Sequence, residues 1–127
     1  MISMREAYEK IGANYDDACA RLMGEEMLAR FALKVLDDES MDKLEAAMAA
    51  GDAKEAFMAA HTLKGVSQNL GFDNLYEPAV VVTEALRGAD AVDGARAGMH
   101  ALQQQYAATM SALREVAEAI EGQKPLF

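Results

Sequence analysis

Four residues of different chemistry recur at helical spacing in the middle of the chain. They are His61, Lys64, Gly65 and Gln68, which stand at i, i+3, i+4 and i+7. On a helix, where each residue turns by about 100°, this spacing places all four on one strip of the surface. The strip would carry an imidazole, an ammonium group, a position without a side chain and an amide.

This combination suits phosphoryl transfer. An exposed histidine is largely neutral near pH 7, and a neutral imidazole is a nitrogen nucleophile. Lys64, one turn away, can stabilise phosphoryl oxygens, and the amide of Gln68 can donate a hydrogen bond to the ring or to the phosphoryl group. Gly65 costs about 1 kcal/mol relative to Ala inside a helix, which indicates that a partner surface must come close there. The residue types on this strip are therefore suited to phosphoryl transfer, with the imidazole of His61 as the nucleophile.

A helix over residues 52–70 would position this strip. Asp52 can cap its start, and Glu55 follows three residues later, at the capping-box position. Leu63, Leu70 and either Val66 or Ser67 would face the core, on the side away from His61. Phe57 and Met58, one turn before His61, are predicted to form an apolar rim beside it.

The remaining chain is punctuated by glycines and helix-capping residues. Apolar residues make up 52% of the sequence, and only two residues are proline, which favours helices over strands. Pro78 should leave an unpaired carbonyl or a slight kink. We expect one domain over residues 1–127, an all-α, up-and-down antiparallel four-helix bundle with one or two short extra N-terminal helices. The other expected helices are 15–23 capped by Asn14, 25–38, 40–50 capped by Ser40, 73–87 capped by Asp73, and 93–121.

The net charge and the cysteine content indicate which partners and which compartment to expect. Twelve Lys and Arg against 21 Asp and Glu give a net charge of −9, which disfavours nucleic acid and acidic membrane surfaces as partners. The single cysteine, Cys19, cannot form an internal disulfide and is ordinary in a reducing compartment. Residues 1–10 lack the apolar stretch of a signal peptide. We therefore expect a cytoplasmic protein, and a monomer.

The motif around His61 also carries a family resemblance. The runs HTLKG at 61–65 and NLG at 69–71 resemble the signature of the histidine phosphotransfer (HPt) domain family. The resemblance implies that His61 is phosphorylated, that Lys64 assists the phosphoryl group and that Gly65 clears space for the partner. The family often has Leu-Glu in the next helix, where this chain has TE at 83–84.

The resemblance implies a passive phosphoryl carrier and not an enzyme. Such domains have no ATP site and do not autophosphorylate. The expected partners are a response-regulator receiver domain, which brings the aspartate and Mg²⁺, and a hybrid sensor histidine kinase. No cofactor and no metal site of the chain's own are expected. The predicted function is that of a phosphorelay intermediate in two-component signalling, which accepts and donates a phosphoryl group on His61.

Three other interpretations were weighed. A non-catalytic helical adaptor that binds signalling proteins is the main alternative. A metal-carboxylate bundle would need Glu three residues before histidine, and neither His61 nor His100 has it. A kinase dimerisation bundle places an acidic residue or Asn after its histidine, and here Thr62 follows. Arg87 is interpreted as a partner of its helix dipole and is left out of the predicted site.

Overall fold

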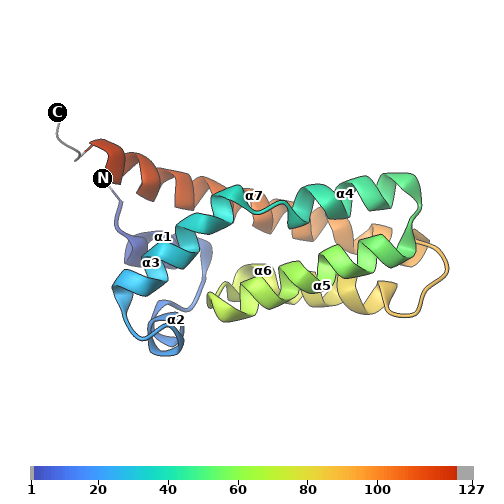
Figure 1. The fold of residues 1–127 in the computed structure, drawn as a ribbon, viewed down its shortest axis with the longest axis horizontal. Helices are drawn as coiled ribbons and strands as arrows, with labels where there is room; N and C mark the ends of the chain where they lie inside the picture. Colours follow the sequence, from blue (N-terminus) through green and yellow to red (C-terminus); the bar gives the residue numbers. More distant parts are fainter. Residues whose placement is uncertain (1, 123–127) are drawn as a thin grey trace.

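The chain folds into helices throughout the part that its computed structural model describes, residues 2–122 (Figure 1). Within that range it contains no strand. No helix in the range has the length and apolarity needed to cross a bilayer. In chain order the helical segments are α1 (Met4–Ile11), α2 (Tyr15–Arg21), α3 (Glu25–Lys34), the 3-10 turn η1 (Val35–Asp37), α4 (Ser40–Ala50), α5 (Ala53–Asn69), α6 (Asp73–Leu86), the 3-10 turn η2 (Asp93–Ala95) and α7 (Arg96–Gly122).

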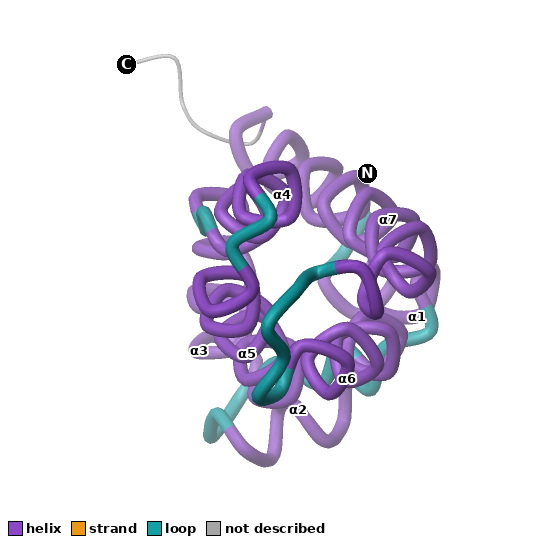
Figure 2. The backbone as a smooth tube through the Cα atoms, turned by 90° about the vertical axis from the view of Figure 1, so that its right-hand side faces the viewer, coloured by secondary structure: helices purple, strands orange, loops and turns teal. Residues whose placement is uncertain are grey.

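The last four helices form the predicted antiparallel bundle. Helix α5 packs between α4 and α6, and α6 packs on α7. Figure 2, which looks along the bundle, shows α4, α5, α6 and α7 arranged around a common axis. Helix α3 and η1 extend the line of α4 toward the other end of α7 (Figure 1). The fold class is confirmed: the two expected N-terminal helices correspond to α2 and α3, and α1 is a further short helix before them.

Apolar stripes on each helix meet in one continuous core. Leu44, Leu63, Leu75 and Leu102, from the four bundle helices, are each at most 1% exposed. In α7, residues at helical spacing from Met99 to Ala117 are buried or half-buried, whereas Ile120, which the same spacing would add to this apolar face, is 42% exposed. Ile120 lies in the last turns of α7, where it lines an open groove together with Ile2, Glu25 and Ala29.

Two of the predicted helix caps are correct. The Asn14 Oδ1 atom accepts a hydrogen bond from the Asp17 amide at 3.0 Å and starts α2. The Asp52 Oδ1 atom does the same for the Glu55 amide at 3.1 Å and starts α5. Each bond satisfies an amide that has no partner within its own helix.

Two other predicted caps are wrong. Ser40 is the first residue of α4, and the Asp38 carboxylate accepts the Ser40 amide hydrogen bond at 2.6 Å. Asp73 is likewise the first residue of α6 and follows Phe72, which makes no side-chain cap. Pro78 lies inside α6, which continues past it to Leu86.

Helix α1 was not predicted, although its sequence carries a start signal. The Ser3 hydroxyl accepts the Glu6 amide at 3.1 Å, and the Glu6 carboxylate accepts the Ser3 amide at 3.3 Å. This reciprocal pair is the capping box that Ser-x-x-Glu indicates. A short helix with such a start is readable from the sequence once the spacing of Ser3 and Glu6 is noticed.

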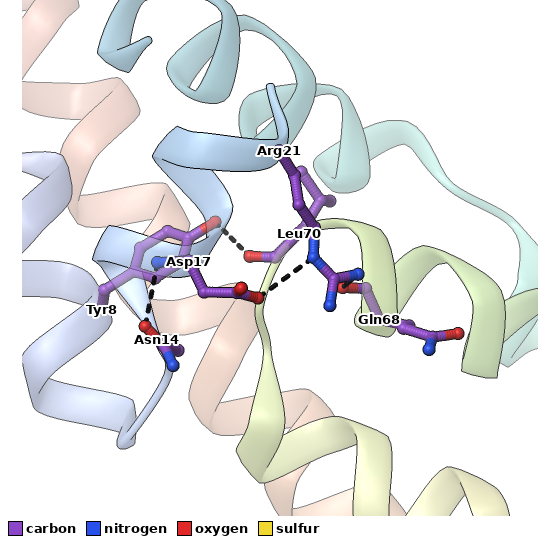
Figure 3. Close-up of polar contacts among 6 residues, drawn as sticks. All are labelled: Tyr8, Asn14, Asp17, Arg21, Gln68 and Leu70. Atoms are coloured by element: carbon purple, nitrogen blue, oxygen red, sulfur yellow. Dashed lines mark hydrogen bonds and ion pairs between the residues drawn. The ribbon is translucent and has the colours of Figure 1, made fainter. Parts of the chain in front are cut away.

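The N-terminal helices fasten the end of α5 (Figure 3). The Tyr8 hydroxyl donates to the Leu70 carbonyl at 2.6 Å, and the Arg21 guanidinium donates to the Gln68 carbonyl at 3.0 Å. The backbone N–H of Asn14 donates a hydrogen bond to the Gly71 carbonyl at 2.7 Å. The carbonyls at a helix end lack partners inside the helix. Here the segment from α1 to α2 supplies donors to the last turn of α5 and to the residues that follow it.

Gly71 makes this close approach possible. Its φ of +66° lies in the left-handed region, and a Cβ there would stand 2.5 Å from the Asn14 carbonyl oxygen. Only glycine meets both conditions without strain. The predicted stop at Gly71 is therefore confirmed, and the same residue also lets the α1–α2 segment dock.

Candidate functional site

Helix α5 brings the four predicted residues to one strip, as their spacing requires. His61 and Gln68 are exposed, and Lys64 and Gly65 are partly buried. Leu63, Ser67 and Leu70 are buried on the core side, and Val66 is half-buried. The division of α5 into a core side and a solvent-facing strip is thus confirmed.

The His61 ring stacks on Phe57. The two ring centroids are 5.7 Å apart, and the ring planes meet at 22°. Phe57 is itself half-buried against the hydrophobic core. One face of the imidazole is therefore supported from the preceding turn of α5, while the histidine as a whole stays open to solvent.

Gly65 leaves open space beside His61. A Cβ built on Gly65 would meet no atom within 4 Å, apart from its own helical backbone and chain neighbours. Gly98 differs, because a Cβ there would lie 3.2 Å from side-chain atoms of Val81 and Val82. Gly98 serves helix packing, whereas packing inside this chain gives no reason for glycine at position 65.

Two residues of α6 and its end belong to this region and were not predicted as site residues. Arg87 and Glu84 form a two-point ion pair, with Nε–Oε2 and Nη2–Oε1 distances of 3.0 Å each. The Arg87 guanidinium also lies 5.1 Å from the centroid of the Phe57 ring. The sequence interpretation of Arg87 as only a helix-dipole partner missed this contact. Spacing reveals the Glu84–Arg87 pair, but only helix packing brings Arg87 to Phe57.

The pKa of the Glu84 carboxyl is lowered by the cationic groups around it. The hydrogen bond from Arg87 lowers the pKa of the Glu84 carboxyl, and the charges of Arg87, Lys64 and His61 lower it further. Partial removal of the carboxylate from water raises the pKa and is the second-largest influence, but it does not cancel the lowering by the hydrogen bond. The carboxylate is therefore held ionised beside the strip, although the chain as a whole is strongly acidic.

Gln68 lies far along the helix from His61. Seven residues correspond to a rise of about 10 Å, and the lean of helical side chains toward the N-terminus is shared by both residues, so it does not change this separation. The bond recorded at Gln68 is the one that its backbone carbonyl accepts from Arg21. A hydrogen bond from the Gln68 amide to a phosphoryl group stays a prediction.

The side of the strip toward α4 is apolar. Met58 is 56% exposed, as its predicted place in a rim requires. It lines a groove of about 580 Å³ between α4 and α5, together with Lys43, Ala47 and Thr62. His61 thus stands between an apolar edge and a charged edge formed by Lys64, Glu84 and Arg87.

Other candidate groups lie apart from this region. His100 is exposed on α7 and has neither Lys nor Gly at the offsets found around His61. Cys19 is a half-buried free thiol. Among residues 2–122, no group of three or more His, Cys, Asp or Glu side chains is arranged to hold a metal ion.

The sequence was also compared with known proteins. A family model described as Hpt domain matches residues 26–116, which include the whole of α4, α5 and α6. The chain belongs to the Hpt domain family. Members are phosphocarriers in two-component signalling, not kinases, and interact with receiver domains and kinases. No curated protein and no solved structure matches the sequence.

The match defines the family core. It contains His61 and its surroundings, from Phe57 to Arg87. Helices α1 and α2 lie outside it, although they bind the end of α5. The predicted single domain over residues 1–127 is thus matched over its central part.

Proposed function

We propose that this chain is a phosphorelay intermediate, which accepts a phosphoryl group on His61 from one receiver aspartate and donates it to another. The observation that carries the proposal is the exposed His61 ring, set between Lys64 and the open face of Gly65 in a chain of the Hpt family. The adaptor interpretation uses neither the imidazole nor the lysine.

The transfer step follows from the chemistry of the imidazole. A ring nitrogen with a free electron pair attacks the phosphorus of the receiver's aspartyl phosphate in line. The P–O bond to the aspartate breaks, and its electron pair leaves with the carboxylate. The ring then carries the phosphoryl group, with its proton on the other nitrogen. The reverse step on a second receiver restores the free histidine.

The neighbouring residues have separate roles in this proposal. The Lys64 ammonium group pairs with phosphoryl oxygens as negative charge shifts toward the leaving carboxylate. Gly65 lets the receiver surface reach the ring without a steric obstacle. Met58 and the groove beside it supply apolar area for docking. Gln68 can bind a phosphoryl oxygen from the far end of the strip.

The partners in this proposal are a receiver domain and a hybrid sensor histidine kinase. The receiver brings the aspartate and its Mg²⁺, and the chain itself needs no cofactor, no metal and no nucleotide. It acts as a monomer in the cytoplasm, where a lone cysteine stays reduced. It is a carrier without autokinase activity.

The test is phosphoryl transfer from a receiver domain charged with acetyl phosphate. The purified protein is incubated with the charged receiver and analysed by mass spectrometry for an acid-labile phosphate. We expect one phosphoryl group, located on His61. The H61Q variant should take up none and should unfold at the same temperature as the wild type, because the side chain is exposed.

His100 provides a matched control. It is also an exposed helical histidine, and H100Q should be phosphorylated as fast as the wild type. Label that persists in H61Q would contradict the proposal. If several competent receivers fail to label the wild type but still bind it, the protein is an adaptor.

A further inference from the structure

A column of side chains joins His61 to the end of α6. Phe57 stacks on the imidazole with the centroids 5.7 Å apart. The Arg87 guanidinium lies over the same phenyl ring, 5.1 Å from its centroid. Glu84 binds Arg87 through two hydrogen bonds of 3.0 Å. Each contact orients the next group, from Glu84 through Arg87 and Phe57 to the imidazole.

The column is not explained by folding. The side chains of Arg87 and Glu84 are 52% and 51% exposed, and such surface ion pairs add little to stability. Phe57 is only half-buried, although a phenyl ring gains most from full burial. Ordering a long arginine side chain also costs conformational entropy. Phe57 packs in part against the core, but folding gives little reason for the ordered Glu84–Arg87 pair above it.

The contact with Phe57 limits the motion of the reactive ring. An exposed histidine on a helix exchanges between rotamers on the picosecond to nanosecond scale. Near-parallel stacking, with 22° between the ring planes, favours the rotamer that keeps the imidazole on Phe57. A nucleophile that already has its attacking orientation loses less entropy in the transition state.

We propose that Phe57, held by the Arg87–Glu84 pair, is a positioning residue that orients the His61 ring for in-line phosphoryl transfer. This role rests on the proposed function. Phe57 and Arg87 act through the ring and do not touch the phosphoryl group. The charged edge of the site thus has a task distinct from that of Lys64, which faces the phosphoryl oxygens.

The first experiment tests the arrangement without any phosphate. A stacked phenyl ring shifts the His61 ring-proton resonances upfield, and NMR on the free protein measures this shift. F57L should move the resonances to their ordinary positions, and R87Q should move them part of the way. F31L is a matched control, because Phe31 is also partly exposed under a cation, Lys34 at 5.4 Å. It should leave the His61 resonances unchanged.

The second experiment measures transfer from a charged receiver at increasing receiver concentration. F57L should lower the maximal rate about tenfold, the order expected for lost orientation of a nucleophile, with little change in the half-saturating concentration. F57W should restore most of the rate, because it restores a stacking partner. R96Q, which removes the similarly spaced and exposed Arg96–Asp93 pair, should behave as the wild type.

The outcomes separate this role from the proposed function. An unchanged maximal rate in F57L, or a rise only in the half-saturating concentration, overturns the positioning role; the latter would make Phe57 a docking residue. Unshifted His61 resonances in the wild type overturn it as well. If the wild type accepts no phosphoryl group, the proposed function fails and the positioning role fails with it.

Discussion

The middle and the C-terminal end of α5 differ in the contacts that the rest of the chain makes with them. Around His61 the helix is open, with one stacked ring and an unobstructed Gly65. At its C-terminal end, the α1–α2 segment donates hydrogen bonds to the carbonyls of Gln68 and Leu70 (Figure 3) and to the carbonyl of Gly71. Few side chains of this chain contact the strip around His61, whereas residues that are distant in the sequence bind the end of the helix.

The difference teaches that stability and proposed chemistry are separated along a single helix. The residues that fasten the end of α5 come from a segment outside the Hpt family match. The residues around His61 lie inside it. Substitutions at the fastened end should therefore change the free energy of unfolding and spare phosphoryl transfer, and substitutions in the open strip should do the reverse.

Gly71→Ala should have the largest effect on stability. The new Cβ would stand 2.5 Å from the Asn14 carbonyl oxygen, at a φ of +66°. Strained backbone and overpacking together cost about 3 kcal/mol, measured by urea unfolding. Gly51→Ala is the control, because φ is +71° there but nothing lies within 4 Å. It should cost only about 1 kcal/mol, and equal losses would refute the close contact at Gly71.

Gly65→Leu should affect transfer and not folding. The site has open space, so a side chain there obstructs only an approaching receiver. We expect about a 100-fold slower transfer, the order of the few kcal/mol that a misfitting interface side chain costs. Gly65→Ala should raise the unfolding free energy by about 0.5–1 kcal/mol. A Gly65→Leu protein that unfolds easily yet transfers phosphoryl groups at the normal rate would contradict the proposed separation of stability from transfer.

Tyr8→Phe should destabilise the fastened end by about 1.5 kcal/mol, because it leaves the buried Leu70 carbonyl without its donor. Chemical denaturation measures this loss, and the transfer rate from a charged receiver should not change. A slower transfer would show that the two parts of α5 are coupled.

The burial of Tyr8 also leads us to expect that the protein loses stability at alkaline pH. Burial, and then the nearby Cys19, raise the pKa of Tyr8 above its ordinary value of 10.0. Because the pKa of Tyr8 is higher in the folded protein than in the unfolded chain, its contribution to the free energy of unfolding is complete below pH 10. That contribution is lost as the pH rises through the pKa of the folded protein. Burial, and then Glu25 and Cys19, raise the pKa of Tyr15 too. Unfolding free energies should therefore fall above pH 10, less steeply in Tyr8→Phe; an identical slope would contradict this.

The smallest effect concerns Glu84 at the open strip. Its carboxyl pKa is lowered, chiefly by the hydrogen bond from Arg87, so its small contribution to stability exists above pH 4.5 and is lost as the pH falls through the folded value. Carbon-13 NMR of the carboxyl should show the titration midpoint moving up in R87Q. R96Q should leave it in place, and a shift there would remove Arg87 as the cause.

The sequence by itself determined the helices except α1, the placement of the His61 strip on the surface of α5, and the family. Helix periodicity and the caps at Asn14 and Asp52 depend on residues three or four positions apart, which a reader of the chain can see directly. The placement of His61, Lys64 and Gly65 on one strip has the same basis. The cap predicted at Ser40 failed because the Asp38 carboxylate accepts a hydrogen bond from the Ser40 amide, and Asp73 is no cap because it is already the first residue of α6.

Only the tertiary structure decided what surrounds that strip. Arg87 reaches Phe57 across 30 positions, and Tyr8 reaches Leu70 across 62. Such contacts depend on how the helices pack, since a side chain gains a distant partner only when the core fixes both backbones. For the same reason, the sequence predicts a glycine stop at Gly71, and only the docked Asn14 carbonyl shows why a side chain has no room there.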